Sequence, residues 1–303
     1  MRILLTGGSS FTGCWFARGL ALAGHEVTAT LRSSSYDGVR AERVSELARH
    51  CETVEGLSFG DDRFVELVRA GGWDLLCVHG AQVEGYRSPD FDVAAALAAN
   101  TRRASDVVAH VPRVLVTGSV FEPGAGRSDD GELPAFSPYG LSKAFTGEVF
   151  RYLCARHGAG FGRFVIPNPF GPMEDPRFTT SLLRAWRAGE TPQVRTPGYV
   201  RDNIHVSLLA LAYVRFAERL PAGGGVVETG PSGYRETQGA FAQRFAREIG
   251  ERLDIATPLE LLPQEDWSEP AVRTNTDPID GSTLGWSEAA AWDELAAWYA
   301  ESS

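Results

Sequence analysis

The chain has 303 residues, enough for one large domain or two interlocked domains with an ample core. Its hydrophobic share of 43% and charged share of 22% exclude disordered, collagenous and coiled-coil proteins. A net charge of −10 argues against a nucleic-acid partner, and no apolar run approaches the roughly 18 residues that span a membrane. The chain begins without a signal-peptide pattern, so we expect a cytoplasmic protein. Neither a metal site nor a disulfide framework is expected from four widely spaced cysteines, Cys14, Cys51, Cys77 and Cys154.

Short apolar segments alternate with helical segments along the first half of the chain. We expect strands at residues 2–6, 26–31, 73–79, 113–116 and 161–167, with an extended piece near 53–59. Helices are expected at residues 14–23, 41–50, 62–70, 91–110 and 138–156. This alternation is typical of a doubly wound parallel sheet with right-handed crossovers, an α/β fold.

The pattern changes after residue 167, where proline and arginine become frequent and long elements become fewer. Helices are expected at 204–220, 238–249 and 287–299, and a strand at 225–229. We therefore expect residues 1–166 to form the dinucleotide-binding domain, with 199–230 returning to it. Residues 167–198 and 231–303 should form a smaller C-terminal substrate-binding cap.

A glycine-rich turn, TGGSSFTG at residues 6–13, lies between the first strand and the first helix. Gly7 permits the tight turn and Gly13 lets the helix pack closely, while Ser10 stands where such turns usually have their middle glycine. Backbone N–H groups at the helix start can bind a pyrophosphate. The turn thus predicts a Rossmann-type cofactor site at Gly7, Ser9, Ser10, Phe11, Thr12 and Gly13.

The end of the second strand bears on the cofactor. NAD-binding folds usually carry an acid there, whereas this strand ends at Arg32, followed by Ser33. A cation and hydroxyl groups suit a 2′-phosphate, which favours NADP, with NAD still possible. Asp61 and Asp62 are candidates to accept a hydrogen bond from the adenine amine, the alternative being a solvated acidic pair.

Tyr139 and Lys143 lie four residues apart on a predicted helix and so share one face. Lys143 is the single lysine beside 28 arginines, and arginine cannot replace a compact ammonium in a tight site. A neighbouring ammonium favours the phenolate of a tyrosine, whose ordinary pKa is near 10. We expect this pair to be catalytic. A third polar group, Thr117 or Ser119, would orient the substrate oxygen.

Taken together, these motifs resemble the extended short-chain dehydrogenase/reductases of the NAD-dependent epimerase/dehydratase family. The likeness also covers VHGAQ at 78–82, Asn100, PNPFGP at 167–172, YVRDNIHV at 199–206 and LGW at 284–286. It implies cofactor contacts from Gly80, Ala81, Gln82 and Pro167. It further implies that Asn168 binds the nucleotide side of a substrate and that Arg201 and Arg273 bind phosphate.

The family pattern TGSVYG aligns its hydroxyl residue with Thr117, whereas counting from the strand start favours Ser119, so both stay candidates. The resemblance implies a homodimer through helices 91–110 and 138–156, with an outer apolar stripe at Val149, Phe150 and Leu153.

Two departures from the family pattern limit the reactions that we expect of this chain. The dehydratases have an acid two residues after the threonine, whereas this chain has Ser119, which disfavours elimination of water. Val165 stands three residues before Asn168, at a position where members of the family frequently have an arginine. We therefore expect an epimerase or a keto-reductase acting on a nucleotide-activated sugar.

Two alternative functions stay open. A reductase of a non-nucleotide carbonyl metabolite would leave Arg201 without a part in binding. A non-catalytic NADP-binding sensor would not need Tyr139 and Lys143. His79 and His205 are expected to be structural.

Overall fold

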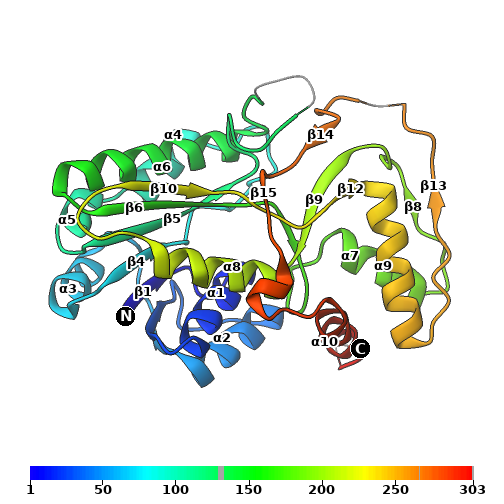
Figure 1. Cartoon of the computed structure of the whole chain (residues 1–303), viewed down its shortest axis with the longest axis horizontal. Helices are drawn as coiled ribbons and strands as arrows, with labels where there is room; N and C mark the ends of the chain where they lie inside the picture. The colour runs from blue at the N-terminus through cyan, green and yellow to red at the C-terminus, as the bar shows by residue number, and fades with distance from the viewer. Residues whose placement is uncertain (129–132, 266, 302–303) are drawn as a thin grey trace.

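A large α/β lobe and a smaller lobe beside it make up the computed structural model, which describes residues 1–128, 133–265 and 267–301 (Figure 1). The large lobe is built on a seven-stranded sheet in the order β10-β6-β5-β4-β1-β2-β3, with every neighbouring pair parallel. Its strands are β1 (Arg2–Thr6), β2 (Glu26–Thr30), β3 (Glu52–Val54), β4 (Leu75–Val78), β5 (Arg113–Ser119), β6 (Gly160–Ile166) and β10 (Val226–Thr229). The strand order reverses between β1 and β4, which is where open α/β sheets bind ligands.

Helices cover both faces of this sheet, which confirms the doubly wound Rossmann-type fold (Figure 1). On one face lie α1 (Phe11–Leu22), α2 (Gly38–His50) and α8 (Val206–Arg219). On the other lie α3 (Asp62–Gly71), α4 (Val93–Asn100), α5 (Ala104–Val108) and α6 (Pro138–His157). Successive residues of β1 enter different cores: Leu5 packs with the α1 side and Leu4 with the α3 side. Strands buried on both faces are apolar throughout, as the sequence of β1 indicates.

The smaller lobe contains a second sheet and its own aromatic core. The sheet comprises β7 (Asn168–Phe170), β9 (Val200–His205), β12 (Tyr234–Thr237) and β14 (Val272–Arg273). Around the fully buried Trp292 pack α7 (Phe178–Arg187), α9 (Gln238–Leu253) and α10 (Glu288–Glu301). Short pairs complete the lobe: β8 (Gln193–Val194) with β13 (Glu260–Leu261), and β11 (Pro231–Ser232) with β15 (Asp277–Pro278), followed by the 3₁₀ turn η1 (Gly281–Leu284).

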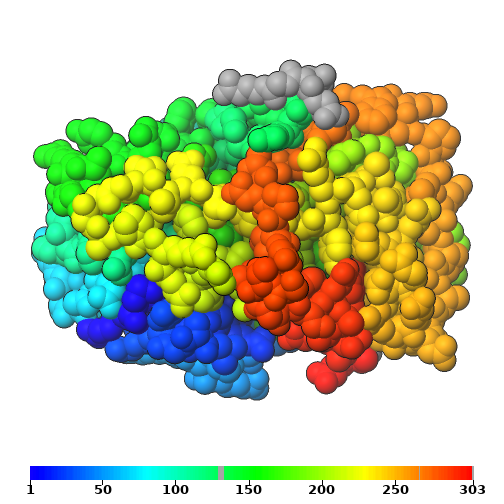
Figure 2. All heavy atoms as spheres, viewed as in Figure 1, coloured from blue at the N-terminus to red at the C-terminus, as the bar shows by residue number. Residues whose placement is uncertain are grey.

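The two lobes are interleaved along the chain. β6 passes into β7 at Pro167, β9 passes into α8 after His205, and β10 passes into β11 at Gly230. Thus α8 and β10 belong to the large lobe, while β9 between residues 200 and 205 pairs within the small sheet. Figure 2 shows the C-terminal segment, in orange and red, seated between α8 and α9. Trp298 of α10 donates a hydrogen bond to Glu42 of α2, which links this segment to the large lobe.

The single helix expected over residues 91–110 is wrong, because the chain breaks it into α4 and α5. Asn100 is buried, and its side chain accepts a hydrogen bond from the Gln82 N–H at 2.8 Å and donates one to Thr146. The chain then turns through a left-handed residue, Arg103, at φ 52°. None of the helices in the described residues is both long and apolar enough to cross a membrane.

Candidate active site

A cavity of about 1320 Å³ opens at the carboxyl ends of the central strands, where the two lobes meet. Its walls come from the glycine turn after β1, the loop after β4, the end of β5, the start of α6 and the segment between β7 and α7. Most of the predicted site residues line it: Gly7, Ser9, Ser10, Phe11, Thr12, Arg32, Gly80, Ala81, Gln82, Thr117, Ser119, Tyr139, Lys143, Pro167, Asn168 and Arg201.

The glycine turn has the geometry of a cradle for a dinucleotide. Gly7 adopts φ 77°, and a Cβ there would lie 2.7 Å from the Cα of Gly80. A Cβ on Gly13 would lie 2.3 Å from the Gly7 carbonyl oxygen, so this glycine serves helix packing behind the wall. Ser10 caps α1 by accepting from the Gly13 N–H at 3.2 Å. Phe11 and Thr12, at the start of α1, line the cavity, and the N–H groups of a helix start suit a pyrophosphate.

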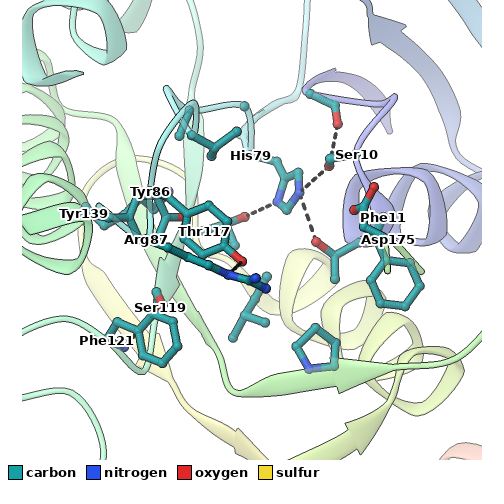
Figure 3. A pocket seen from close by; sticks show the side chains of 18 of the residues that line it. Ser10, Phe11, His79, Tyr86, Arg87, Thr117, Ser119, Phe121, Tyr139 and Asp175 are labelled. Atoms are coloured by element: carbon teal, nitrogen blue, oxygen red, sulfur yellow. Dashed lines mark hydrogen bonds between the residues drawn. The ribbon is translucent and has the colours of Figure 1, made fainter. Parts of the chain in front are cut away.

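The side chain of His79 contacts both this turn and the end of β5 (Figure 3). It therefore lies nearer to the candidate site than we expected of a histidine with only a structural role. Its Nδ1 lies 3.0 Å from the Thr117 hydroxyl, and its Nε2 lies 3.0 Å from Ser10 and 3.2 Å from Thr12. Burial, followed by the charge of Lys143, lowers the pKa of His79 to about 3. A neutral imidazole therefore holds three hydroxyl groups in place. His205, in contrast, is buried and caps α8 through the Ser207 N–H.

Tyr139 and Lys143 enter the cavity from the first turns of α6. Ser137 caps this helix by accepting from the Gly140 N–H, which fixes where the helix begins. The ring of Tyr139 packs edge-on against Tyr86, 5.6 Å between centroids, and Lys143 is only 5% exposed. Burial raises the pKa of Tyr139, and the charge of Glu122 raises it further. Burial lowers the pKa of Lys143, while Glu122 opposes that effect.

Both candidates for the third polar group line the cavity. Thr117 is 3% exposed and its hydroxyl is engaged by His79. Ser119 is less buried, and its hydroxyl oxygen accepts from the Phe121 N–H at 3.2 Å. Thr117 is therefore oriented by a side chain and Ser119 by the backbone, so both hydroxyl groups stay candidates.

The cavity wall is basic although the chain as a whole is acidic. Its charged lining residues are the cations Arg32, Arg40, Arg43, Arg87, Lys143, Arg177 and Arg201, and the acids Glu174, Asp175 and Glu269. Two arginines are paired with these acids, Arg43 with Asp175 at 3.1 Å and Arg201 with Glu269 at 2.7 Å. Burial raises the pKa of Glu174 to about 7, which reduces its negative charge near neutrality. The cavity consequently suits ligands that carry several negative charges.

Arg43 was not anticipated from the sequence. It is fully buried, and its guanidinium donates to the Met173 carbonyl oxygen at 2.6 and 2.8 Å and to the Ser9 carbonyl oxygen at 3.4 Å. Met173 itself adopts a left-handed φ of 64°. This one side chain therefore joins the glycine turn to the segment before α7.

Besides Gly13, four residues predicted to bind the cofactor or the substrate do not line the cavity. Asp61 caps α3 through the Phe64 N–H at 2.7 Å, and Asp62 pairs with Arg103. Ser33 bonds within its own turn, to the Ser35 carbonyl oxygen. Arg273 is buried, donates to the Val120 and Pro134 carbonyl oxygens, and so supports the wall rather than facing into it. Within residues 1–128, 133–265 and 267–301, no three potential ligands are grouped to hold a metal ion.

A doubly wound sheet, a dinucleotide cradle and a tyrosine–lysine pair on one helix define an enzyme of the short-chain dehydrogenase/reductase class. The model of the NAD dependent epimerase/dehydratase family matches residues 3–230, and the chain belongs to that family. No match was found among curated protein sequences.

Solved structures with the same fold cover the chain almost completely at low sequence identity. The UDP-glucose 4-epimerase of Thermotoga maritima with UDP-glucose has a TM-score of 0.73 at 18% identity, covering 100% of this chain and 99% of its own. The UDP-glucuronic acid 4-epimerase of Bacillus cereus with UDP-glucuronic acid and NAD has 0.73 at 14%, covering 100% of both chains. The dTDP-glucose 4,6-dehydratase of Streptomyces venezuelae with NAD has 0.67 at 20%, covering 99% and 97%.

The neutral state of His79 predicts a pH dependence of folding. Between about pH 6.5 and pH 3 the unfolded chain binds a proton at this histidine that the folded chain does not, so stability falls as the pH falls. Replacement by glutamine should lower the slope of unfolding free energy against pH in this window by about 1.4 kcal/mol per pH unit. Urea unfolding at several pH values measures the slope. Equal slopes for wild type and His79→Gln would contradict a neutral His79.

Proposed function

We propose that the chain is an NADP-dependent epimerase or keto-reductase that acts on a nucleotide-activated sugar. The observation that carries this proposal is the placing of Tyr139 and Lys143 in one basic cavity with the glycine turn. The nicotinamide, when bound, supplies or accepts a hydride. All the residues assigned to the cofactor here line the cavity, and most of them have small side chains, so they fit a dinucleotide: Gly7, Ser9, Ser10, Phe11, Thr12, Gly80, Ala81, Gln82 and Pro167.

The substrate end of the cavity supports a nucleotide sugar. Asn168 and Arg201 both line it, on adjacent strands of the small sheet. The Arg201 guanidinium is held by Glu269 and by the Val200 carbonyl oxygen and lies over the ring of Tyr199. A diphosphate would compete with the Glu269 carboxylate for this fork of donors. A non-nucleotide carbonyl would leave the ion pair closed, so a thermal-shift panel of UDP-, GDP-, CDP- and dTDP-sugars separates the two functions.

NADP rather than NAD is favoured by two arginines at the same end of the cavity. Arg32 follows β2 and Arg40 lies in the first turn of α2, and both are exposed cavity-lining residues. The structure describes no ion pair for either of them. Two guanidinium groups without an acidic partner among residues 1–128, 133–265 and 267–301 suit a 2′-phosphate.

Removing this charge should therefore reverse the cofactor preference. Arg32→Asp, and more strongly Arg32→Asp with Arg40→Gln, should weaken NADP binding by about tenfold or more per lost charge-assisted bond. The dissociation constants of NADP and NAD, measured by fluorescence quenching, test this. Arg49→Gln, on the outer surface of α2, should change neither constant. Wild-type protein that binds NAD as tightly as NADP would overturn the assignment.

The chemical step is assigned to the residues at the end of β5 and the start of α6. Tyr139 takes a proton from a substrate hydroxyl or donates one to a carbonyl oxygen. Lys143 supports the phenolate electrostatically and can hold the nicotinamide ribose. Thr117 or Ser119 holds the same substrate oxygen. The absence of an acid at Ser119 keeps elimination of water disfavoured.

Tyr139→Phe keeps the ring contacts and removes only the proton carrier. Turnover should fall by roughly 10²–10⁴-fold with little change in cofactor affinity, which steady-state kinetics and cofactor titration measure. Tyr152→Phe, on the exposed side of α6, is the matched control and should be fully active. Near-full turnover of Tyr139→Phe on its true substrate would refute the mechanism and favour the sensor function.

Two further substitutions refine the same test. Lys143→Arg should also lose activity, because a planar guanidinium cannot occupy the position of the buried ammonium. Thr117→Ala and Ser119→Ala, assayed in parallel, identify the hydroxyl that contacts the substrate.

A homodimer through α6 is part of the proposal. The stripe expected at Phe150 and Leu153 is wrong, because both are buried. The outward face instead presents Phe145 and Tyr152, at 45% and 65% exposure, with the half-buried Val149 between them. Their spacing of four and then three residues places them on one side of the helix.

Glutamate at Phe145 and Tyr152 should therefore give a monomer, because charges in an apolar interface lose their hydration without a partner. Sedimentation equilibrium measures the state. Leu22→Glu, at an exposed position on α1, should stay dimeric. A monomeric wild-type chain at micromolar concentration would contradict this interface.

A further inference from the structure

The carboxylate of Glu122 lies behind the wall of the candidate active site, and no function was expected of it from the sequence. Glu122 is 0% exposed and stands at the position of the last glycine of the TGSVYG pattern. Its Oε1 accepts a hydrogen bond from the Ser119 N–H at 2.7 Å. Its Oε2 accepts from Nη2 of Arg163 on β6. Buried acids are rare unless paired, and this one is paired on both oxygens.

Glycines make the room for this ion pair. A Cβ on Gly118 would lie 3.0 Å from Oε1 of Glu122 and 3.4 Å from Nε of Arg163. A Cβ on Gly140 would lie 2.0 Å from the carbonyl oxygen of Phe121, the residue before Glu122, so α6 packs directly on this turn. The ion pair is therefore enclosed between the end of β5 and the first turns of α6.

The face of α6 that meets the ion pair also carries the predicted catalytic lysine. Gly140, Lys143 and Gly147 follow one another at spacings of three and four residues, so they share one side of the helix. A Cβ on Gly147 would be 3.8 Å from Nε of Arg163. The turn that carries Glu122, together with Arg163, thus lies against the helix face on which Lys143 stands.

The charged and titratable groups around Lys143 come from several elements. Glu122 follows β5 and raises the pKa of Lys143, whereas Arg163 on β6 lowers it by a smaller amount. Tyr139 on α6 has its own pKa raised by Glu122 and lowered by Arg177 before α7. His79 after β4 is neutral near pH 7, and Glu228 on β10 lies 3.8 Å from the far side of Arg163.

We propose that Glu122 is a positioning residue of the active site, which fixes the backbone of Ser119 and places a negative charge behind the face of α6 that carries Lys143. The proposal rests on the proposed function in that Tyr139 and Lys143 are taken as the catalytic pair. Arg163 holds the carboxylate in this orientation from β6, while Ser119 receives it at the end of β5. A purely structural ion pair would need no influence on the lysine.

The single lysine makes the proposal directly measurable. Selective nitrogen-15 labelling of lysine gives one side-chain NMR signal, which reports the titration of Lys143 without any substrate. Glu122→Gln keeps the shape and an acceptor for Ser119 but removes the charge, so Lys143 should titrate at lower pH than in wild type. Glu228→Gln, which leaves Glu122 in place, should not move the titration. Identical titration curves for wild type and Glu122→Gln would overturn the proposal.

A folding defect is separated from this effect by a second variant. Glu122→Gln with Arg163→Gln leaves no unpaired buried charge, and Lys143 should still titrate at lower pH because Glu122 has the larger influence. With a sugar nucleotide that the wild type turns over, both variants should lose turnover at high pH. Their NADP affinity, measured below the pH at which the NMR signal of Lys143 titrates, should be unchanged, since neither residue lines the cavity. If no sugar nucleotide is turned over, the proposed function fails while the NMR titration still decides this inference. A loss of NADP affinity equal to the loss of turnover would indicate a structural role alone.

Discussion

The buried guanidinium of Arg43 connects the parts of the molecule that must act together. It binds the Met173 carbonyl oxygen and pairs with Asp175, both in the segment before α7, and it reaches the Ser9 carbonyl oxygen in the glycine turn. A fully buried cation needs such partners, because an uncompensated charge in the interior costs several kcal/mol. The glycine turn and the segment before α7 are thereby fixed to one another.

The distribution of charge follows from this arrangement. The chain has a net charge of −10, yet arginines from α2 and from the loops after β2 and β4 line one cavity. These cations make the potential at the cavity positive although the chain as a whole is acidic. Another arginine that lines the cavity, Arg201, has its positive charge balanced by the carboxylate of Glu269, with which it forms an ion pair. Ligand phosphates would take over that compensating function.

Local patterns predicted the parts of the site that depend on local structure. The glycine turn and the four-residue spacing of Tyr139 and Lys143 need only a strand, a turn and a helix in sequence, and periodicity predicts these. Asp61 also had a local signal, since an aspartate directly before a predicted helix is a common N-cap.

Long-range partners could not be predicted in this way. Arg43 donates a hydrogen bond to a carbonyl oxygen 130 residues away in the sequence. Glu122, which follows β5, pairs with Arg163 on the neighbouring strand β6. The break at Arg103 follows an alanine-rich stretch with high helix propensity, at a point where the buried Asn100 side chain accepts a hydrogen bond from the Gln82 N–H. His79 looked like a packed strand-end residue because its three hydroxyl partners come from two other segments. Tertiary contacts decided each of these cases.

The interleaving of the two lobes along the chain affects how the protein unfolds. Three covalent connections join the lobes, at Pro167, after His205 and at Gly230. Two bodies joined by a single flexible linker can melt in separate steps, whereas bodies threaded through one another lose their packing together. A single calorimetric transition is the natural outcome of this topology. A nucleotide held by the large lobe would then protect the small lobe from heat and proteases as effectively as its own ligand.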